Sequence, residues 1–132
     1  MRTLRQKLRD KADTLFSLYV RTRDNFTCRR CLTQYPHNSM GYHCSHYYGR
    51  TIFATRWDET NCDGLCFGCH RIWEKEQREA YRDFKVGQLG QKGFDELKAR
   101  SMIMHVQTSF IQDKIDWLKE KLEEYSLGKG IL

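Results

Sequence analysis

The sequence has no run of apolar residues long enough to cross a membrane, and its basic, amphipathic beginning lacks the apolar segment of a signal peptide. Internal repeats and low-complexity tracts are also absent, and Pro36 is the only proline. We therefore expect no membrane partner. Together with the cysteine pattern described below, these absences predict a location in the cytoplasm of a bacterial or phage-infected cell.

The length of 132 residues predicts a single domain, 1–132. Hydrophobic residues make up 39% of the chain, which is enough for a modest core. A domain of this size would still gain stability from a bound metal. We divide it into a basic N-terminal helix (1–27), a metal-held core (28–85) and a C-terminal helical region (94–127).

Helical periodicity marks both ends of the chain. In residues 3–22, apolar residues recur every three or four positions, and Arg and Lys occupy the other face. Near the C-terminus an apolar stripe has heptad-like spacing, and Gly128 is the predicted stop. Such a stripe either packs on the N-terminal helix, which we favour, or forms the seam of a homodimer. Its members are Ile111, Ile115, Leu118, Leu122 and Tyr125.

The middle of the chain mixes short strands with a helix. Residues 32–60 lack periodicity, and we expect one short strand near Tyr42–Cys44 and a second near Cys62–Leu65. A polar helix follows from about His70 to Lys85. The fold class is therefore α+β. The chain is then expected to break at Gly87, Gly90 and Gly93.

The formal charge of +6 is concentrated in residues 1–30, which hold nine basic and three acidic residues. A polyanion such as DNA or RNA is the natural partner of such a segment. The alternative is a solvated helix face without a ligand. Arg5 and Arg9 are candidate phosphate contacts in this segment.

Two Cys-x-x-Cys pairs, Cys28/Cys31 and Cys66/Cys69, enclose the centre of the sequence. Four thiolates with this spacing can hold one tetrahedral zinc ion. A disulfide framework is the alternative, but the paired spacing without an export signal favours metal. The remaining cysteines, Cys44 and Cys62, are either small buried apolar residues or substitute ligands, and we favour burial.

Three polar residues are left over that a structural zinc does not need: His46, Asn61 and His70. The order Cys-x-x-Cys, His46, Asn61, then Cys-x-x-Cys-His70 resembles the HNH nuclease motif. The closest resemblance is to phage recombination nucleases of the lambda Rap (NinG) kind. The matching stretch runs from Cys28 to about Trp73, roughly a third of the chain.

The resemblance implies a small ββα-metal core that holds one catalytic divalent metal and hydrolyses DNA phosphodiester bonds. Such a reaction needs a general base for the attacking water and a cation for the charge that develops on the phosphate. By resemblance, His46 is the base and His70 is a metal ligand. Asn61 would brace the loop that holds His46. Recombination on branched DNA is the narrower biological role that the resemblance implies.

The sequence departs from the family pattern at the first metal ligand. Many relatives have Asp or His directly before the base, where this chain has Ser45. His43 is the candidate replacement, and Glu74, one helical turn after His70, is a second. A His-rich site would favour Mn²⁺, Ni²⁺ or Zn²⁺ over Mg²⁺. Candidate phosphate clamps beside the site are Arg50, Arg56 and Arg71.

Three alternatives stay open. A non-catalytic zinc-dependent DNA-binding module would explain the cysteines and the basic segment, but would make His46, Asn61 and His70 coincidental. An HNH nuclease of packaging, homing or restriction type would share the same core. A redox protein is disfavoured, because each cysteine pair has a partner pair and no thioredoxin-like βαβ pattern surrounds it.

Overall fold

A computed structural model describes residues 1–129 and shows an α+β fold. No helix in this range is both long and apolar enough to cross a membrane. In chain order the elements are α1 (Leu4–Arg23), β1 (Tyr42–His46), α2 (Phe53–Arg56), the 3₁₀ turn η1 (Glu59–Asn61), β2 (Cys62–Cys66), α3 (Phe67–Arg71), the π-helical turn η2 (Ile72–Glu76), α4 (Arg78–Ser101) and α5 (Thr108–Lys129).

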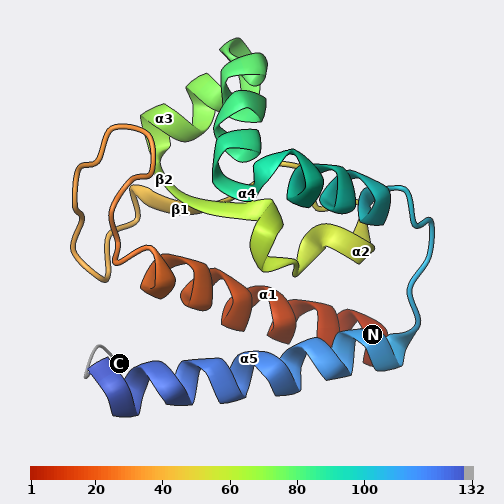
Figure 1. The fold of residues 1–132 in the computed structure, drawn as a ribbon. Helices are drawn as coiled ribbons and strands as arrows, with labels where there is room; N and C mark the ends of the chain where they lie inside the picture. The colour runs from red at the N-terminus through yellow and green to blue at the C-terminus, as the bar shows by residue number, and fades with distance from the viewer. Residues whose placement is uncertain (130–132) are drawn as a thin grey trace.

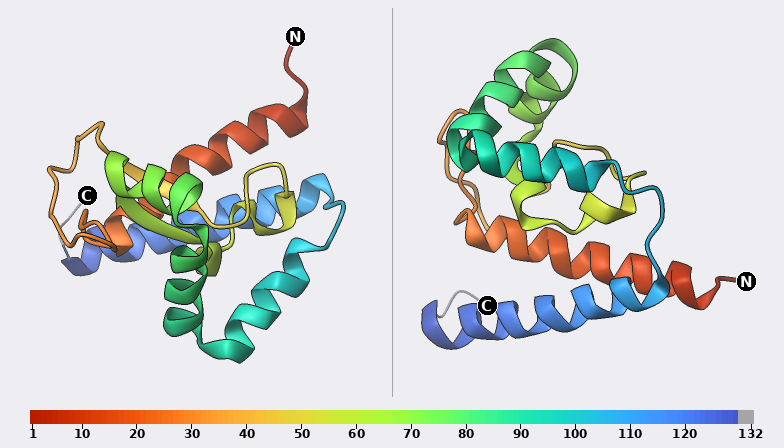
Figure 2. Two further views of the ribbon diagram at one scale, coloured as in Figure 1. Left: turned by 90° about the horizontal axis from the view of Figure 1, so that it is seen from above. Right: turned by 45° about the vertical axis from the view of Figure 1, so that its right-hand side comes forward.

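Helices α1 and α5 form one layer and run side by side in the same direction (Figures 1 and 2). A capping box between Thr3 and Gln6 begins α1 and satisfies its first backbone N–H groups. The apolar stripe of α5 packs against the buried face of α1, with Phe16 of α1 and Ile115 of α5 in one core cluster. This confirms the prediction that the C-terminal stripe packs on the N-terminal helix.

Strands β1 and β2 form a two-stranded antiparallel sheet in which Tyr42 pairs with Cys66 and His46 with Cys62. The sheet lies between the α1/α5 layer and the layer of α3 and α4 (Figure 1). Both faces of β2 are therefore covered, which explains why all five of its residues are buried. The two expected strands are confirmed. β1 continues beyond the expected Cys44 to His46, and β2 continues beyond Leu65 to Cys66.

The helical region after His70 differs from the prediction in its breaks. Instead of the single helix expected from about His70 to Lys85, the chain forms the end of α3, the π-helical turn η2 and the start of α4. Of the three glycines expected to break the chain, only Gly90 does so, with φ of 75° between two segments merged in α4. Gly87 and Gly93 stay helical, because tertiary packing outweighs their low propensity. Helix α5 also continues past the predicted stop at Gly128, to Lys129.

Candidate functional site

The Cys-x-x-Cys pairs come together at the open end of the β-hairpin. The four sulfur atoms of Cys28, Cys31, Cys66 and Cys69 lie within 4.8 Å of one another. Tetrahedral zinc with bonds of about 2.3 Å places its sulfur ligands about 3.8 Å apart. The distance of 4.0 Å between the sulfurs of Cys31 and Cys66 is close to that value. The cluster could therefore hold a structural metal such as zinc.

Hydrogen bonds to sulfur surround this four-cysteine cluster. The backbone N–H of Cys69 points at Cys66 Sγ at 3.5 Å, and the Arg30 guanidinium donates to Cys69 Sγ at 3.3 Å. Bonds with Thr33 lower the pKa of the Cys31 thiol to about 6. The contacts with Thr33 and Arg30 favour thiolates, the form that binds metal, whereas burial raises the pKa of the Cys69 thiol to about 12. Arg29, which lies between the two cysteines of the first pair, forms an ion pair with the buried Asp24 at 3.3 Å.

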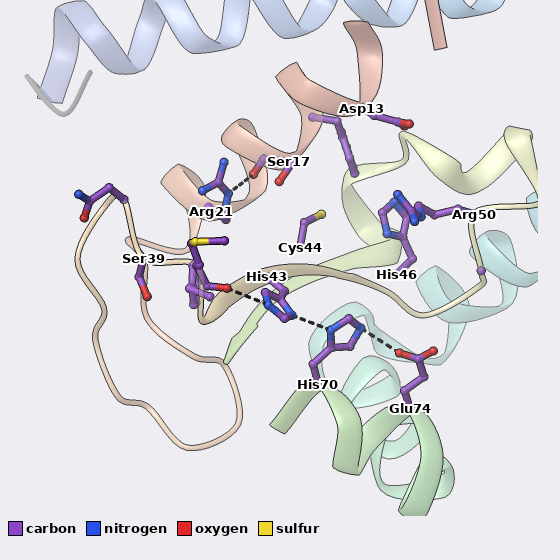
Figure 3. Close-up of a pocket in the computed structure, with 15 residues that line it drawn as sticks. Asp13, Ser17, Arg21, Ser39, His43, Cys44, His46, Arg50, His70 and Glu74 are labelled. Carbon is purple, nitrogen blue, oxygen red and sulfur yellow. Dashed lines mark hydrogen bonds and ion pairs between the residues drawn. The ribbon is translucent and has the colours of Figure 1, made fainter. Parts of the chain in front are cut away.

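A pocket of about 690 Å³ opens between α1, β1 and the α3–η2 helical segment. Figure 3 shows its polar lining, with His43, His70 and Glu74 in one row and His46 near Arg50. The hairpin brings these side chains together, because β1 carries His43 and His46 while β2 leads directly into α3, which carries His70. Three of the histidines in the sequence thus line one cavity.

His46 ends β1, and its ring is oriented by a backbone group. Its Nε2 lies 2.9 Å from the carbonyl oxygen of Arg56. A carbonyl only accepts hydrogen bonds, so Nε2 carries the proton and Nδ1 keeps the free electron pair. Burial lowers the pKa of His46 to about 4, and the positive charges of Arg50 and Arg56 act in the same direction. His46 is therefore a neutral imidazole at pH 7.

We expect His46 to titrate near pH 4 in the folded protein and near the ordinary value of about 6.5 in the urea-unfolded chain. Between these values the unfolded chain binds a proton that the folded chain excludes. The free energy of unfolding contributed by His46 is then present above pH 6.5 and is lost as the pH falls through about 4. Long-range ¹H–¹⁵N NMR of the imidazole without added divalent metal measures both the midpoint and the protonated nitrogen. A folded-state midpoint at or above 6.5 would contradict the assignment.

Asn61 is fully buried and ties the loop after His46 to the start of β2. Its Nδ2 donates to the carbonyl oxygens of Tyr48 and Thr55, at 3.0 and 2.9 Å. Its Oδ1 accepts from the Tyr48 N–H at 2.8 Å. These bonds hold the loop whose far end presents the Arg56 carbonyl to His46.

Replacing Asn61 by alanine leaves the N–H and the carbonyl of Tyr48 without this partner, whereas the Thr55 carbonyl still accepts from the Asp58 N–H. Each unsatisfied group costs about 1–3 kcal/mol, so we expect the free energy of unfolding to fall by roughly 2 kcal/mol or more. Urea unfolding followed by circular dichroism measures the loss. The exposed Asn38, replaced by alanine as a control, should change the free energy by less than about 0.5 kcal/mol. An equal loss of unfolding free energy in both variants would contradict the role of Asn61 in holding the loop.

His43 and His70 face each other through their Nδ1 atoms, which lie 3.2 Å apart. The other nitrogen of His43 lies 3.1 Å from the Met40 carbonyl oxygen, and that of His70 lies 2.9 Å from the Glu74 carboxylate. Both of these partners are acceptors, so both Nε2 atoms carry the proton. Burial lowers the pKa of His70, which favours its neutral form. Two electron pairs therefore point at each other, an arrangement that a shared cation would stabilise.

Neither Ser45, which precedes the proposed base, nor the candidate ligand Glu74 faces the space between His43 and His70. Ser45 is buried, and its hydroxyl lies 3.2 Å from the Tyr81 hydroxyl in the layer under α4. Glu74 contacts the nitrogen of His70 that faces away from His43. In this arrangement Glu74 orients His70 instead of completing a ligand set with it.

The candidate phosphate clamps differ in their exposure and in whether the guanidinium group is already paired. Arg50 is exposed and lines the pocket, and Arg71 is exposed beside Glu76. Arg56, expected to face phosphate, instead pairs with Asp13 through two nitrogens at 2.9 and 2.6 Å. Arg5 donates to the Val106 carbonyl and so joins α1 to the start of α5.

Arg9 forms an ion pair with its neighbour Asp10 at 3.0 Å, and both side chains are partly exposed. It is therefore less free to meet phosphate than the sequence suggested. Among the arginines proposed from the sequence, Arg50 has the clearest access to the pocket.

Sequence reasoning missed two carboxylates that support the site, the half-buried Asp13 and the fully buried Asp63. Asp13 of α1 accepts from Arg56 and from the Trp57 indole at 2.9 Å, which positions the residue whose carbonyl orients His46. Asp63 of β2 forms a fully buried ion pair with Lys85 at 3.0 Å. Neither pairing has a local signal, because the partners lie 22 or more residues apart in the sequence.

The chain matches no protein-family model, no curated protein and no solved structure. The resemblance to HNH nucleases therefore stays a prediction from the motif, and the functional argument depends on the geometry of the pocket.

Proposed function

We propose that this protein is a divalent-metal-dependent endonuclease that hydrolyses DNA phosphodiester bonds, with His46 as the general base. The observation that carries the proposal is the arrangement of one pocket. The pocket contains His46, a neutral imidazole that carries its proton on Nε2. It also contains His43 and His70, whose Nδ1 electron pairs point at each other. A purely structural role requires neither feature.

In the proposed reaction, His46 Nδ1 takes the proton of the water that attacks phosphorus. The Arg56 carbonyl, bonded to Nε2, then stabilises the imidazolium that forms. A pKa near 4 in the free protein keeps the imidazole unprotonated and ready at pH 7. Asn61 supports this geometry from a distance, because it holds the loop between Tyr48 and Thr55.

The residues opposite His46 fit a catalytic metal. Two nitrogen ligands at about 2.1 Å from one ion and a tetrahedral angle lie about 3.4 Å apart, close to the observed 3.2 Å between the Nδ1 atoms of His43 and His70. Glu74 fixes the tautomer of His70 from behind, as carboxylates do for metal-binding histidines. A divalent ion held here would neutralise charge that develops on the phosphate oxygens. Two imidazoles favour Mn²⁺, Ni²⁺ or Zn²⁺ over Mg²⁺.

The four-cysteine cluster supports a separate structural role for zinc in this proposal. It connects the segment after α1 to the start of α3, and thereby holds His70 close to the hairpin. A closed set of four thiolates has no open position for a substrate, which distinguishes it from the histidine pair.

DNA is the proposed polyanion because Arg50 stands beside His46 at the pocket and exposed cations, such as Lys7 and Lys11, lie on α1. Each phosphate contact contributes roughly 0.9 to the slope of log affinity against log salt. Branched DNA in phage recombination is the narrower form of the proposal.

A cleavage panel tests the proposal. Linear, flapped, looped and four-way DNA are incubated with Mg²⁺, Mn²⁺ or Zn²⁺ added separately, and a chelator serves as the control. We expect cleavage with added Mn²⁺ and weaker cleavage with added Mg²⁺. Salt-sensitive binding of every substrate without cleavage under any condition would instead support the non-catalytic DNA-binding module.

A further inference from the structure

Three side chains of types that can bind metal, one of them His46, gather on the face of the hairpin that packs toward α1. In the antiparallel register His46 lies directly opposite Cys62. Cys44 is two residues before His46 and therefore shares its face of the sheet. Cys44 pairs with Gly64, and glycine has no side chain that could fill the space beside Cys44. Ligand atoms of Cys44, His46 and Cys62 lie within 4.8 Å of one another.

This group has the composition and access of an exchangeable metal site. Zinc bound by two sulfurs and one nitrogen requires separations of about 3.5–3.8 Å, so ligand atoms that all lie within 4.8 Å of one another need to approach by at most about 1 Å. Cys62 is fully buried, whereas Cys44 and His46 line the pocket. The fourth position around an ion held here would therefore face the pocket. Sites with three protein ligands and one open position exchange their metal and water, unlike closed sites of four cysteines.

We propose that Cys44, His46 and Cys62 form a second thiolate metal site, specific for a thiophilic ion such as Zn²⁺ and separate from the four-cysteine cluster. Two thiolates select Zn²⁺ over Mg²⁺ and Mn²⁺, which prefer oxygen ligands. Binding releases the two thiol protons to solvent. We call this group the hairpin thiol site.

The hairpin thiol site shares His46 with the proposed reaction, so an ion bound there should affect cleavage. This effect on cleavage rests on the proposed function. The Arg56 carbonyl accepts a hydrogen bond from Nε2–H, so Nδ1 is the nitrogen that can bind either the ion or the proton of water. An ion at the hairpin thiol site therefore removes the general base. Excess Zn²⁺ should switch off cleavage even when Mn²⁺ is saturating.

Cobalt substitution tests the site without measuring activity. Cobalt bound to thiolate has a sulfur-to-metal charge-transfer absorption, which a histidine-only site lacks. We expect two thiolate-bound Co²⁺ ions per wild-type chain and one in Cys62→Ala. His43→Ala is the matched control and should keep two, because it changes only the facing histidine pair. If Cys62→Ala does not fold, Cys44→Ala provides the same comparison. One such ion in wild type, or two in both cysteine variants, overturns the proposal.

Inhibition by Zn²⁺ tests the link to catalysis. Cleavage with saturating Mn²⁺ is measured as Zn²⁺ increases, and each variant is normalised to its own rate without Zn²⁺. Wild type should be inhibited at a Zn²⁺ concentration at least about tenfold lower than Cys62→Ala. Equal sensitivity would overturn the inhibitory role. A wild-type protein that cuts no substrate would refute the proposed function alone, and the cobalt count would still decide the metal site.

Discussion

His46→Ala is expected to reduce DNA cleavage by roughly 10²–10⁴-fold, the usual contribution of a general base. DNA affinity and the four-cysteine cluster should be unchanged, because His46 lies outside the cluster. Higher concentrations of Mn²⁺ should not restore the rate, since no other group replaces the lost proton acceptor. Single-turnover cleavage and a binding assay on the same DNA separate the two effects.

His70→Ala provides the contrast. It removes one of the two facing nitrogens, so cleavage should fall through weakened metal binding and recover in part at high Mn²⁺. His37, which is exposed and stacks on Phe26 outside the pocket, is the control, and His37→Ala should cut at the wild-type rate. Wild-type cleavage by His46→Ala would disprove the base assignment.

Cys66→Ala is expected to unfold the domain or leave it without a stable hairpin. Cys66 ends β2, caps α3 and contributes one sulfur to the four-cysteine cluster. Binding of structural zinc contributes about 10–16 kcal/mol in small zinc domains at neutral pH, which is as large as the total stability of a typical domain, about 5–15 kcal/mol. Circular dichroism and native mass spectrometry of the purified variant measure fold and metal content together.

Cys44→Ala is the matched cysteine control for this effect. Cys44 lies outside the four-cysteine cluster, so this variant should stay folded and keep one zinc bound by the cluster. Prolonged chelation of the wild-type protein should unfold it in the same way as Cys66→Ala. A folded, metal-free Cys66→Ala protein would show that the cluster does not stabilise the fold.

Local pattern predicts most of the elements. Apolar spacing indicates the N-terminal helix at 3–22, and the structure places α1 at Leu4–Arg23. The two short strands are also expected at the right places, and the structure has β1 at Tyr42–His46 and β2 at Cys62–Cys66. The glycine breaks fail as predictions because a glycine costs a helix only about 1 kcal/mol, which packing can offset. Only Gly90, with its positive φ, interrupts the helix.

The contacts of the arginines cannot be predicted from local sequence pattern. Arg56 stands between the two histidines of the motif, and its position in the sequence favours contact with phosphate. Its guanidinium is instead committed to Asp13, a partner 43 residues away. No spacing rule connects residues so distant, because their contact depends on where α1 crosses the loop before β2.

The sequence by itself determined which cysteines can form a four-ligand set, where the long helices lie, and the order of His46, Asn61 and His70, since these depend on residue type and local spacing. Only the tertiary structure decided which nitrogen of each histidine keeps its electron pair. That choice depends on the acceptors that face the rings, the carbonyl groups of Arg56 and Met40 and the carboxylate of Glu74. It also decided that Cys44 and Cys62 lie beside His46, because strand register places residues from two segments on one face.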